Sequence, residues 1–348
     1  MAHKRDDRVR LHRIQPHPRP VQPRPLRPRQ SCQQRRHTAT HLYHRRPWRA
    51  PVLGGNMLRI IVALFALVLF TAPADAAVKV VATLPWIGSL AKEIGKDRVT
   101  VTTLVKTSQD PHSIEARPSM IAAVRRADLL IYNGLDLEVG YLPILMESAR
   151  NPAINPGNAG NLNCSVYVDP LEKPATASRE NGDVHPLGNP HYHLSPANIK
   201  KMAIGIGERL AKVDQANAGF YRANTARFVA QVDHKMKEWK GRKLQGKRFV
   251  AQHRFFEYLA ADFGFRIVGY LEEKPGIPPS SAHIQALVSS MSGHRPDAIL
   301  STEYHDRTIS GFVSSKTGVK SVIVPHDVGA NGSRDWFSLM DSVIKSLE

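Results

Sequence analysis

Short β-rich runs alternate with helical patterns along most of this chain, and this rhythm limits the folds open to it. Segment 117–127 (RPSMIAAVRRA) shows the helical part, with a proline near the first turn and apolar residues at helical spacing. Alternation of strands with helices predicts mostly parallel sheets that are covered on both faces. Seven runs have strand character, and they lie at 78–84, 99–105, 128–134, 247–252, 266–271, 297–302 and 320–325.

The strand rhythm stops between Pro196 and about Lys243, and it then resumes. Within this interval, segment 217–239 carries apolar residues at the spacing of a single long helix. The sequence therefore predicts an α/β fold with two lobes of mostly parallel sheet, joined by this helix. The predicted boundaries are an N-terminal lobe over 77–195, a helical segment over 196–245 and a C-terminal lobe over 246–348.

Residues 57–76 (MLRIIVALFALVLFTAPADA) have the pattern of a secretory signal peptide. A basic residue, Arg59, precedes an apolar run that is too short to cross a bilayer comfortably, and a small-x-small end closes at Ala76. We therefore expect cleavage after Ala76 and export to the periplasm. A signal peptide belongs at a chain start, so we also expect translation to begin at Met57, which makes 1–56 a gene-model extension.

The strongly basic composition comes mainly from residues 1–56. The whole chain has a formal net charge of +18, and 13 Arg and one Lys against two Asp place +12 of it in this arm, which leaves +6. Its many prolines, glutamines and arginines predict disorder. A basic arm that binds nucleic acid is the alternative interpretation. For the mature protein we expect no nucleic-acid partner.

Three histidines follow predicted strands: His112 after 99–105 by a short loop, and His253 and His326 directly after their runs. In open α/β sheets, ligands bind at the carboxyl ends of the strands, and loops of two lobes can meet in one cleft. Neutral imidazole suits zinc, and three or four such nitrogens make a tetrahedral site. The alternative is that each histidine is a polar loop residue.

Four segments together resemble the cluster A-I solute-binding proteins of zinc and manganese ABC transporters, the ZnuA/TroA-like family. The resemblance covers essentially all of 77–348. It implies two lobes joined by a rigid helix, a metal site in the cleft between them, and a monomer that captures a divalent metal ion and delivers it to a membrane permease without catalysis. The segments are DPHSIEARPSM (110–120), ADLLIYNGLDLE (127–138), NPHYHLSP (189–196) and FVAQHRFFEYLAADFGF (249–265).

The resemblance also implies the metal ligands. His112, His191 and His253 match the three histidine ligands of the family. His193 stands where the family usually has Trp, so we expect it not to bind the metal. Asn189 replaces the usual Asp, and its amide can still hold the loop.

The fourth ligand stays open at this point. Register with the family's acidic ligand favours His326, whereas Asp327 lies beside it and water is a third option. His185 lies in the loop ATASRENGDVHPLG (175–188). Because this loop is poor in histidine, we expect it to have little part in gathering metal ions.

Zinc is the expected metal because three imidazoles favour it, and manganese, which prefers oxygen ligands, is possible. The rival function is a secreted zinc hydrolase, with three histidines, an open position for water, and Glu303 or Asp327 as the base.

Overall fold

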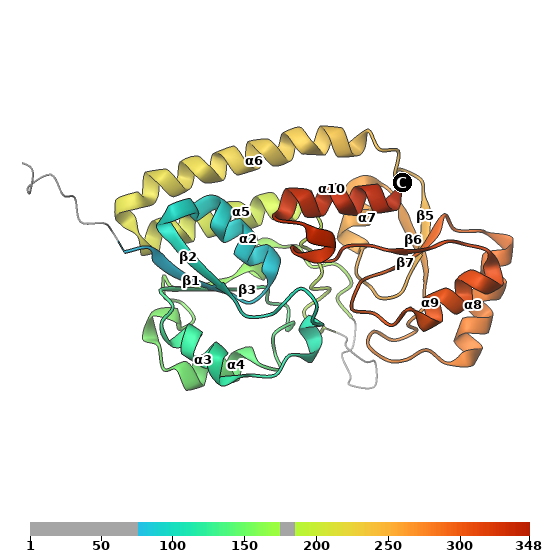
Figure 1. Cartoon of the computed structure of the whole chain (residues 1–348), viewed down its shortest axis with the longest axis horizontal. Coiled ribbons are helices and arrows are strands. Elements are labelled where there is room, and N and C mark those ends of the chain that lie inside the picture. The colour runs from blue at the N-terminus through green and yellow to red at the C-terminus, as the bar shows by residue number, and fades with distance from the viewer. Residues whose placement is uncertain (1–75, 175–184) are drawn as a thin grey trace, which may run out of the picture. The chain divides into compact units, whose positions relative to one another are not determined.

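The computed structural model describes residues 76–174 and 185–348, which lie in one compact unit, Ala72–Glu348. It contains two four-stranded sheets, and every strand pair in both is parallel. Figure 1 shows the two sheets with helices packed around them. The predicted basic arm (1–56) and the signal peptide (57–76) lie outside the described residues, apart from Ala76.

The first sheet has the strand order β2-β1-β3-β4. The central strand β1 is apolar on both faces, and its Val80 lies opposite Val101 of β2 and Leu129 of β3. Such two-sided burial is what a parallel sheet with helices on both faces requires. The strands are β1 (Val78–Ala82), β2 (Val99–Thr103), β3 (Leu129–Tyr132) and β4 (Asn161–Asn163).

Three helices connect these strands, and each has a proline in its first turn, where the missing N–H costs nothing. Helix α2 packs on β1 and β2, and α3 packs on α4 at the other side of the sheet in Figure 1. The helices are α2 (Pro85–Gly95), α3 (Pro118–Arg125) and α4 (Leu142–Ala149).

Two long helices follow the first sheet. Helix α5 (Pro196–Val213) begins at the N-cap Ser195, whose side chain accepts a hydrogen bond from the backbone of Asn198. Helix α6 (Ala218–Lys240) packs side by side with α5, as Figure 1 shows, and both contact α2. The long helix predicted over 217–239 is confirmed by α6.

The second sheet repeats the topology of the first, with the order β6-β5-β7-β8. All seven predicted strands are present in the two sheets, and β4 is the strand that the sequence analysis missed. The strands are β5 (Arg248–Ala251), β6 (Arg266–Tyr270), β7 (Ala298–Ser301) and β8 (Ser321–Ile323).

The two faces of the second sheet belong to different apolar clusters. Adjacent residues of a strand point to opposite faces, so Phe249 and Ala251 join the main core, whereas Val250 joins a smaller cluster with residues of α8 and α9. The main core also contains the first sheet and α10. The helices of this half are α7 (Glu257–Phe263), α8 (Ser281–Gly293), α9 (Arg307–Thr317) and α10 (Trp336–Leu347).

Helix α10 ties the two halves together. Its first residue, Trp336, is fully buried and packs edge-on against Trp239 of α6. The Trp336 indole N–H donates to the backbone oxygen of His193, and its backbone N–H donates to Ser89 of α2. The end of the chain thus packs against helices from the first half.

The predicted α/β architecture with two lobes is confirmed. The exact lobe boundaries (77–195, 196–245 and 246–348) stay a prediction. Within 76–174 and 185–348, no helix is both long enough and apolar enough to cross a membrane.

Candidate metal centre

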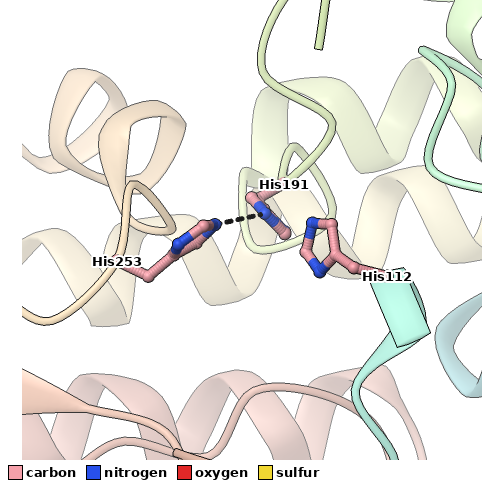
Figure 2. A group of neighbouring side chains, drawn as sticks. All are labelled: His112, His191 and His253. Atoms are coloured by element: carbon pink, nitrogen blue, oxygen red, sulfur yellow. Dashed lines mark hydrogen bonds between the residues drawn. The ribbon is translucent and has the colours of Figure 1, made fainter. Parts of the chain in front are cut away.

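Three histidines from distant parts of the chain converge on one point. His112, His191 and His253 each offer a ring nitrogen, and these three atoms all lie within 4.8 Å of one another. Figure 2 shows the three rings facing a common centre from three different segments. The structure therefore brings together three of the four histidines predicted as ligands.

His112 is held by a short 3-10 turn, Pro111–Ser113, which follows the loop after β2. The Asp110 carboxylate caps this turn by accepting a hydrogen bond from the His112 backbone N–H at 3.0 Å. The same Oδ1 atom lies 2.8 Å from the ring Nδ1 of His112. One carboxylate thus fixes both the backbone and the ring of this residue.

His191 lies in the loop that leads into α5, and Asn189 holds this loop. The Asn189 side-chain oxygen accepts from the backbone N–H of His191 at 2.9 Å, and its amide nitrogen donates to the backbone oxygen of Arg254 at 2.9 Å. The Tyr258 hydroxyl donates to the backbone oxygen of Asn189. The amide therefore links the His191 loop to the segment that carries His253.

His253 follows β5, the strand at the point where the chain order of the second sheet reverses. Its Nδ1 lies 2.8 Å from Oε2 of Glu272, which follows the neighbouring strand β6. The same Glu272 oxygen accepts from the backbone of Gly276. The parallel pairing of β5 with β6 places the carboxylate beside the ring.

The hydrogen bonds determine which ring nitrogens face the centre. A carboxylate can only accept, so Nδ1 carries the proton in both His112 and His253, and Nε2 keeps its lone pair. Nε2 of His253 lies 3.2 Å from Nε2 of His191 (Figure 2). Tetrahedral zinc at about 2.0 Å from each nitrogen separates its ligands by about 3.3 Å.

The His112 Nε2 atom is buried and has no hydrogen-bond partner among the described residues. Two ring nitrogens in contact also need a proton or a cation between them. These two features, with three converging nitrogens, are what a divalent-cation site requires.

The charge states of the groups around this site favour the binding of a cation. Burial, together with repulsion from His112 and His253, holds the pKa of His191 well below its usual range, so this ring is neutral near pH 7. Burial raises the pKa of Asp110, but its bonds to His112 outweigh this and lower the pKa to about 2. Burial also raises the pKa of Glu272, but its hydrogen bond to His253 outweighs this effect and leaves the pKa below its usual value. Two carboxylate charges therefore stand behind two of the imidazoles.

His193 is directed away from this cluster, although it is only two residues from His191. It is buried, its ring stacks on Trp86, and its Nε2 donates to the backbone oxygen of His326 at 2.6 Å. Burial lowers the pKa of His193 to about 4. These contacts support the expectation that it does not bind the metal.

The structure does not place His326 in the three-histidine group. Its Nδ1 lies 2.7 Å from Oε2 of Glu303, and its ring contacts Tyr304 and Phe255. Asp327 is buried and accepts from the backbone of Val328. Its role and that of His326 as a fourth ligand stay predictions.

Cavities border the cluster on two sides. One of about 290 Å³ is lined by His191, His253, Asn189 and His185. The other, of about 310 Å³, is lined by residues that include His112, His253 and Glu272. His305 also lines the second cavity, and its Nε2 lies 3.9 Å from Glu272 Oε1.

Three residues at the site were not predicted as parts of it from the sequence: Asp110, Glu272 and His185. Asp110 carried a usable signal, because Asp two residues before a backbone N–H commonly caps a turn. Glu272 carried none, since its contact with His253 depends on which strands are neighbours.

Comparison with known proteins places these features in a family. A family model described as zinc-uptake complex component A periplasmic, ZnuA, matches residues 80–348. A solved crystal structure of ZnuA superposes with a TM-score of 0.65 and 24% identity, covering 77% of this chain and 97% of that one. At this identity the structural likeness shows the fold alone.

Two curated relatives are similar in sequence. The high-affinity zinc uptake system protein ZnuA of Bacillus subtilis is 28% identical over 244 residues, which is 67% of this chain and 73% of that protein. The manganese ABC transporter substrate-binding lipoprotein PsaA of Streptococcus anginosus is 27% identical over 222 residues, which is 60% of this chain and 69% of that protein.

Proposed function

The chain belongs to the ZnuA family of periplasmic zinc-uptake components, and on this premise we propose that it captures zinc in the periplasm and delivers it to an ABC transporter permease. The observation that carries the proposal is the convergence of ring nitrogens from His112, His191 and His253. The relatives include a zinc uptake protein and a manganese transporter component, so divalent metal is the shared substrate.

Zinc is the favoured metal because of the donor set. The described cluster offers three imidazole nitrogens, and its carboxylates bind the rings rather than facing the centre. Nitrogen ligands suit zinc, whereas manganese prefers carboxylate and water oxygens. Manganese is therefore the second candidate.

The ligands in this proposal are His112, His191 and His253, with Asp110 and Glu272 orienting two of the rings. Outer carboxylates of this kind raise the basicity of the imidazole and fix its orientation. The loop on Asn189 links the His191 segment to the segment that carries His253.

The family and the pattern of residues 57–76 support a place of action in the periplasm. We propose that the signal peptide is removed after Ala76, that mature protein begins at Ala77, and that it works as a monomer with lobes at 77–195 and 246–348. Mass spectrometry of the N-terminus of secreted protein tests the processing, and retention of the arginine-rich arm would contradict it.

The rival function, a secreted zinc hydrolase, has no support. The family and the curated relatives are metal-binding transport proteins. We propose that this protein likewise binds and releases its ion without catalysis.

A transport experiment tests the function. A strain lacking the gene should grow poorly when zinc is chelated and should take up less radioactive zinc, and the wild-type gene should restore both. His191→Ala should restore neither, whereas His294→Ala, an exposed position at the end of α8, should restore both. Full rescue of growth and zinc uptake by His191→Ala would contradict the zinc proposal. So would growth of the deletion strain that is restored only when manganese is supplied.

A further inference from the structure

The three-histidine cluster leaves one position of a tetrahedral zinc site to be filled. Structural zinc sites that are closed to water take four protein ligands. His326, the residue expected there, packs its ring against Tyr304 and Phe255, and none of the ring contacts among the described residues joins it to the three histidines. A different side chain already lies at the cluster.

His185 packs directly against His112. Their ring centroids are 5.3 Å apart, which matches the ring spacings inside the cluster: 5.2 Å for His112–His191, 5.6 Å for His112–His253 and 5.2 Å for His191–His253. His185 also lines the cavity of about 290 Å³ together with His191 and His253. The ring of His185 is therefore as close to the His112 ring as the three rings of the cluster are to one another.

The tautomer of His185 suits a metal ligand. Its ring interacts with the backbone of Leu135, in the loop after β3, whereas its Nε2 is buried and has no partner among the described residues. A carbonyl oxygen can only accept, so this interaction favours a proton on Nδ1. The lone pair of Nε2 is then free. A backbone carbonyl behind the ring is a common support for a metal-binding histidine.

The backbone around His185 is fixed to the segment that carries His191. The His185 backbone oxygen accepts from Gly188, and Asn189 donates to the backbone oxygen of Leu171. Gly188 has φ +110°, and a Cβ there would lie 2.9 Å from that Leu171 oxygen, so glycine is required. The turn at Gly188 therefore fixes the backbone positions of both His185 and His191.

We propose that His185 supplies the fourth nitrogen ligand, so that the site is closed by four imidazoles, and that His326 supports the fold instead. The inference rests on the proposed zinc function. Among the described residues, His185 belongs to no group of three ligand atoms that lie within 4.8 Å of one another, so zinc binding must draw this ring inward by a side-chain movement.

X-ray absorption of zinc-loaded protein purified from the periplasm tests the inference. Wild type should show four imidazole nitrogens, and His185→Ala should show three with an added oxygen. His185→Ala should also weaken zinc binding by at least tenfold in competition with a chelator. His326→Ala should keep four nitrogens and change the affinity less than threefold.

His185→Gln guards against a folding defect, because it keeps most of the side-chain volume and should lose the same imidazole. Four imidazoles in both His185 variants, or a loss of one only in His326→Ala, would overturn the inference while leaving zinc transport intact. Failure of the wild-type protein to bind zinc would instead overturn the proposed function.

Discussion

The Nδ1 atom of His253 lies 2.8 Å from Oε2 of Glu272, and on the other side of the same ring Nε2 lies 3.2 Å from Nε2 of His191. The carboxylate and the neighbouring imidazole thus act on opposite edges of one ring. The carboxylate holds the proton on the outer edge, so the inner edge presents a lone pair. This relationship can be tested without removing a ligand.

Glu272→Gln should weaken zinc binding about 10–100-fold, as is usual for loss of a carboxylate behind a metal-binding histidine. The amide keeps the size of the side chain, but it loses the charge that favours a cation. Competition against a chelator measures the change. Glu303→Gln, which removes the same charge beside His326, is the matched control and should change the affinity much less. Equal losses in both variants would indicate a general charge effect.

His191 and His193, two residues apart in the loop before α5, should have different roles. His191→Ala should abolish tight zinc binding and leave the apo protein folded. His193→Ala should keep zinc binding within a few-fold but lower the free energy of unfolding by roughly 1–3 kcal/mol, because it leaves the buried His326 oxygen without its donor. Chelator competition and chemical denaturation measure the two effects. A larger loss of zinc affinity in His193→Ala than in His191→Ala would mean that this loop is wrongly aligned with the family motif.

Asp327 should make stability depend on pH. Burial raises the pKa of Asp327 from 3.8 to about 7. Between these two pH values the folded protein therefore holds a proton that the unfolded chain has released. Stability from this group is therefore greatest below pH 4 and is lost as pH rises through about 7, by at most about 4 kcal/mol.

Asp327→Asn replaces the protonated carboxyl by a neutral group of the same shape. Relative to this variant, the apo wild-type protein should become less stable between pH 5 and pH 8. Denaturation at several pH values measures the difference, and parallel curves for the two proteins would show that Asp327 is ionised in the folded state.

Much of the fold follows from local pattern. The strands were predictable because buried parallel strands are apolar on both faces, as in β1 and β3. Strand β4 was not, because its three residues, Asn161–Asn163, include two asparagines. It exists because β3 offers an edge to pair with, which is a property of the tertiary structure.

The site was predictable only in part. His112 and His253 were visible as histidines after strands, and His191 came from the resemblance. The carboxylate on His253 comes from the neighbouring strand, and His185 reaches the cluster through a glycine turn. Register with relatives favours His326, but its ring packs against Tyr304 and Phe255 and it is not part of the three-histidine group.

Zinc should stabilise the folded protein strongly. A ligand that binds only the folded state adds about 4 kcal/mol at a free concentration a thousand times its Kd. Calorimetry should therefore show a clearly higher melting temperature with zinc for the wild type and no shift for His191→Ala. A zinc shift of equal size in both proteins would point to binding elsewhere, for instance at surface histidines.

The most direct test of the central claim is a zinc titration of metal-free protein, wild type beside a variant in which His112, His191 and His253 are all replaced by alanine. The account predicts one tightly bound zinc per wild-type chain and none in the variant, with both proteins folded. One zinc bound with unchanged affinity by the triple variant would contradict the claim that these three histidines hold the ion.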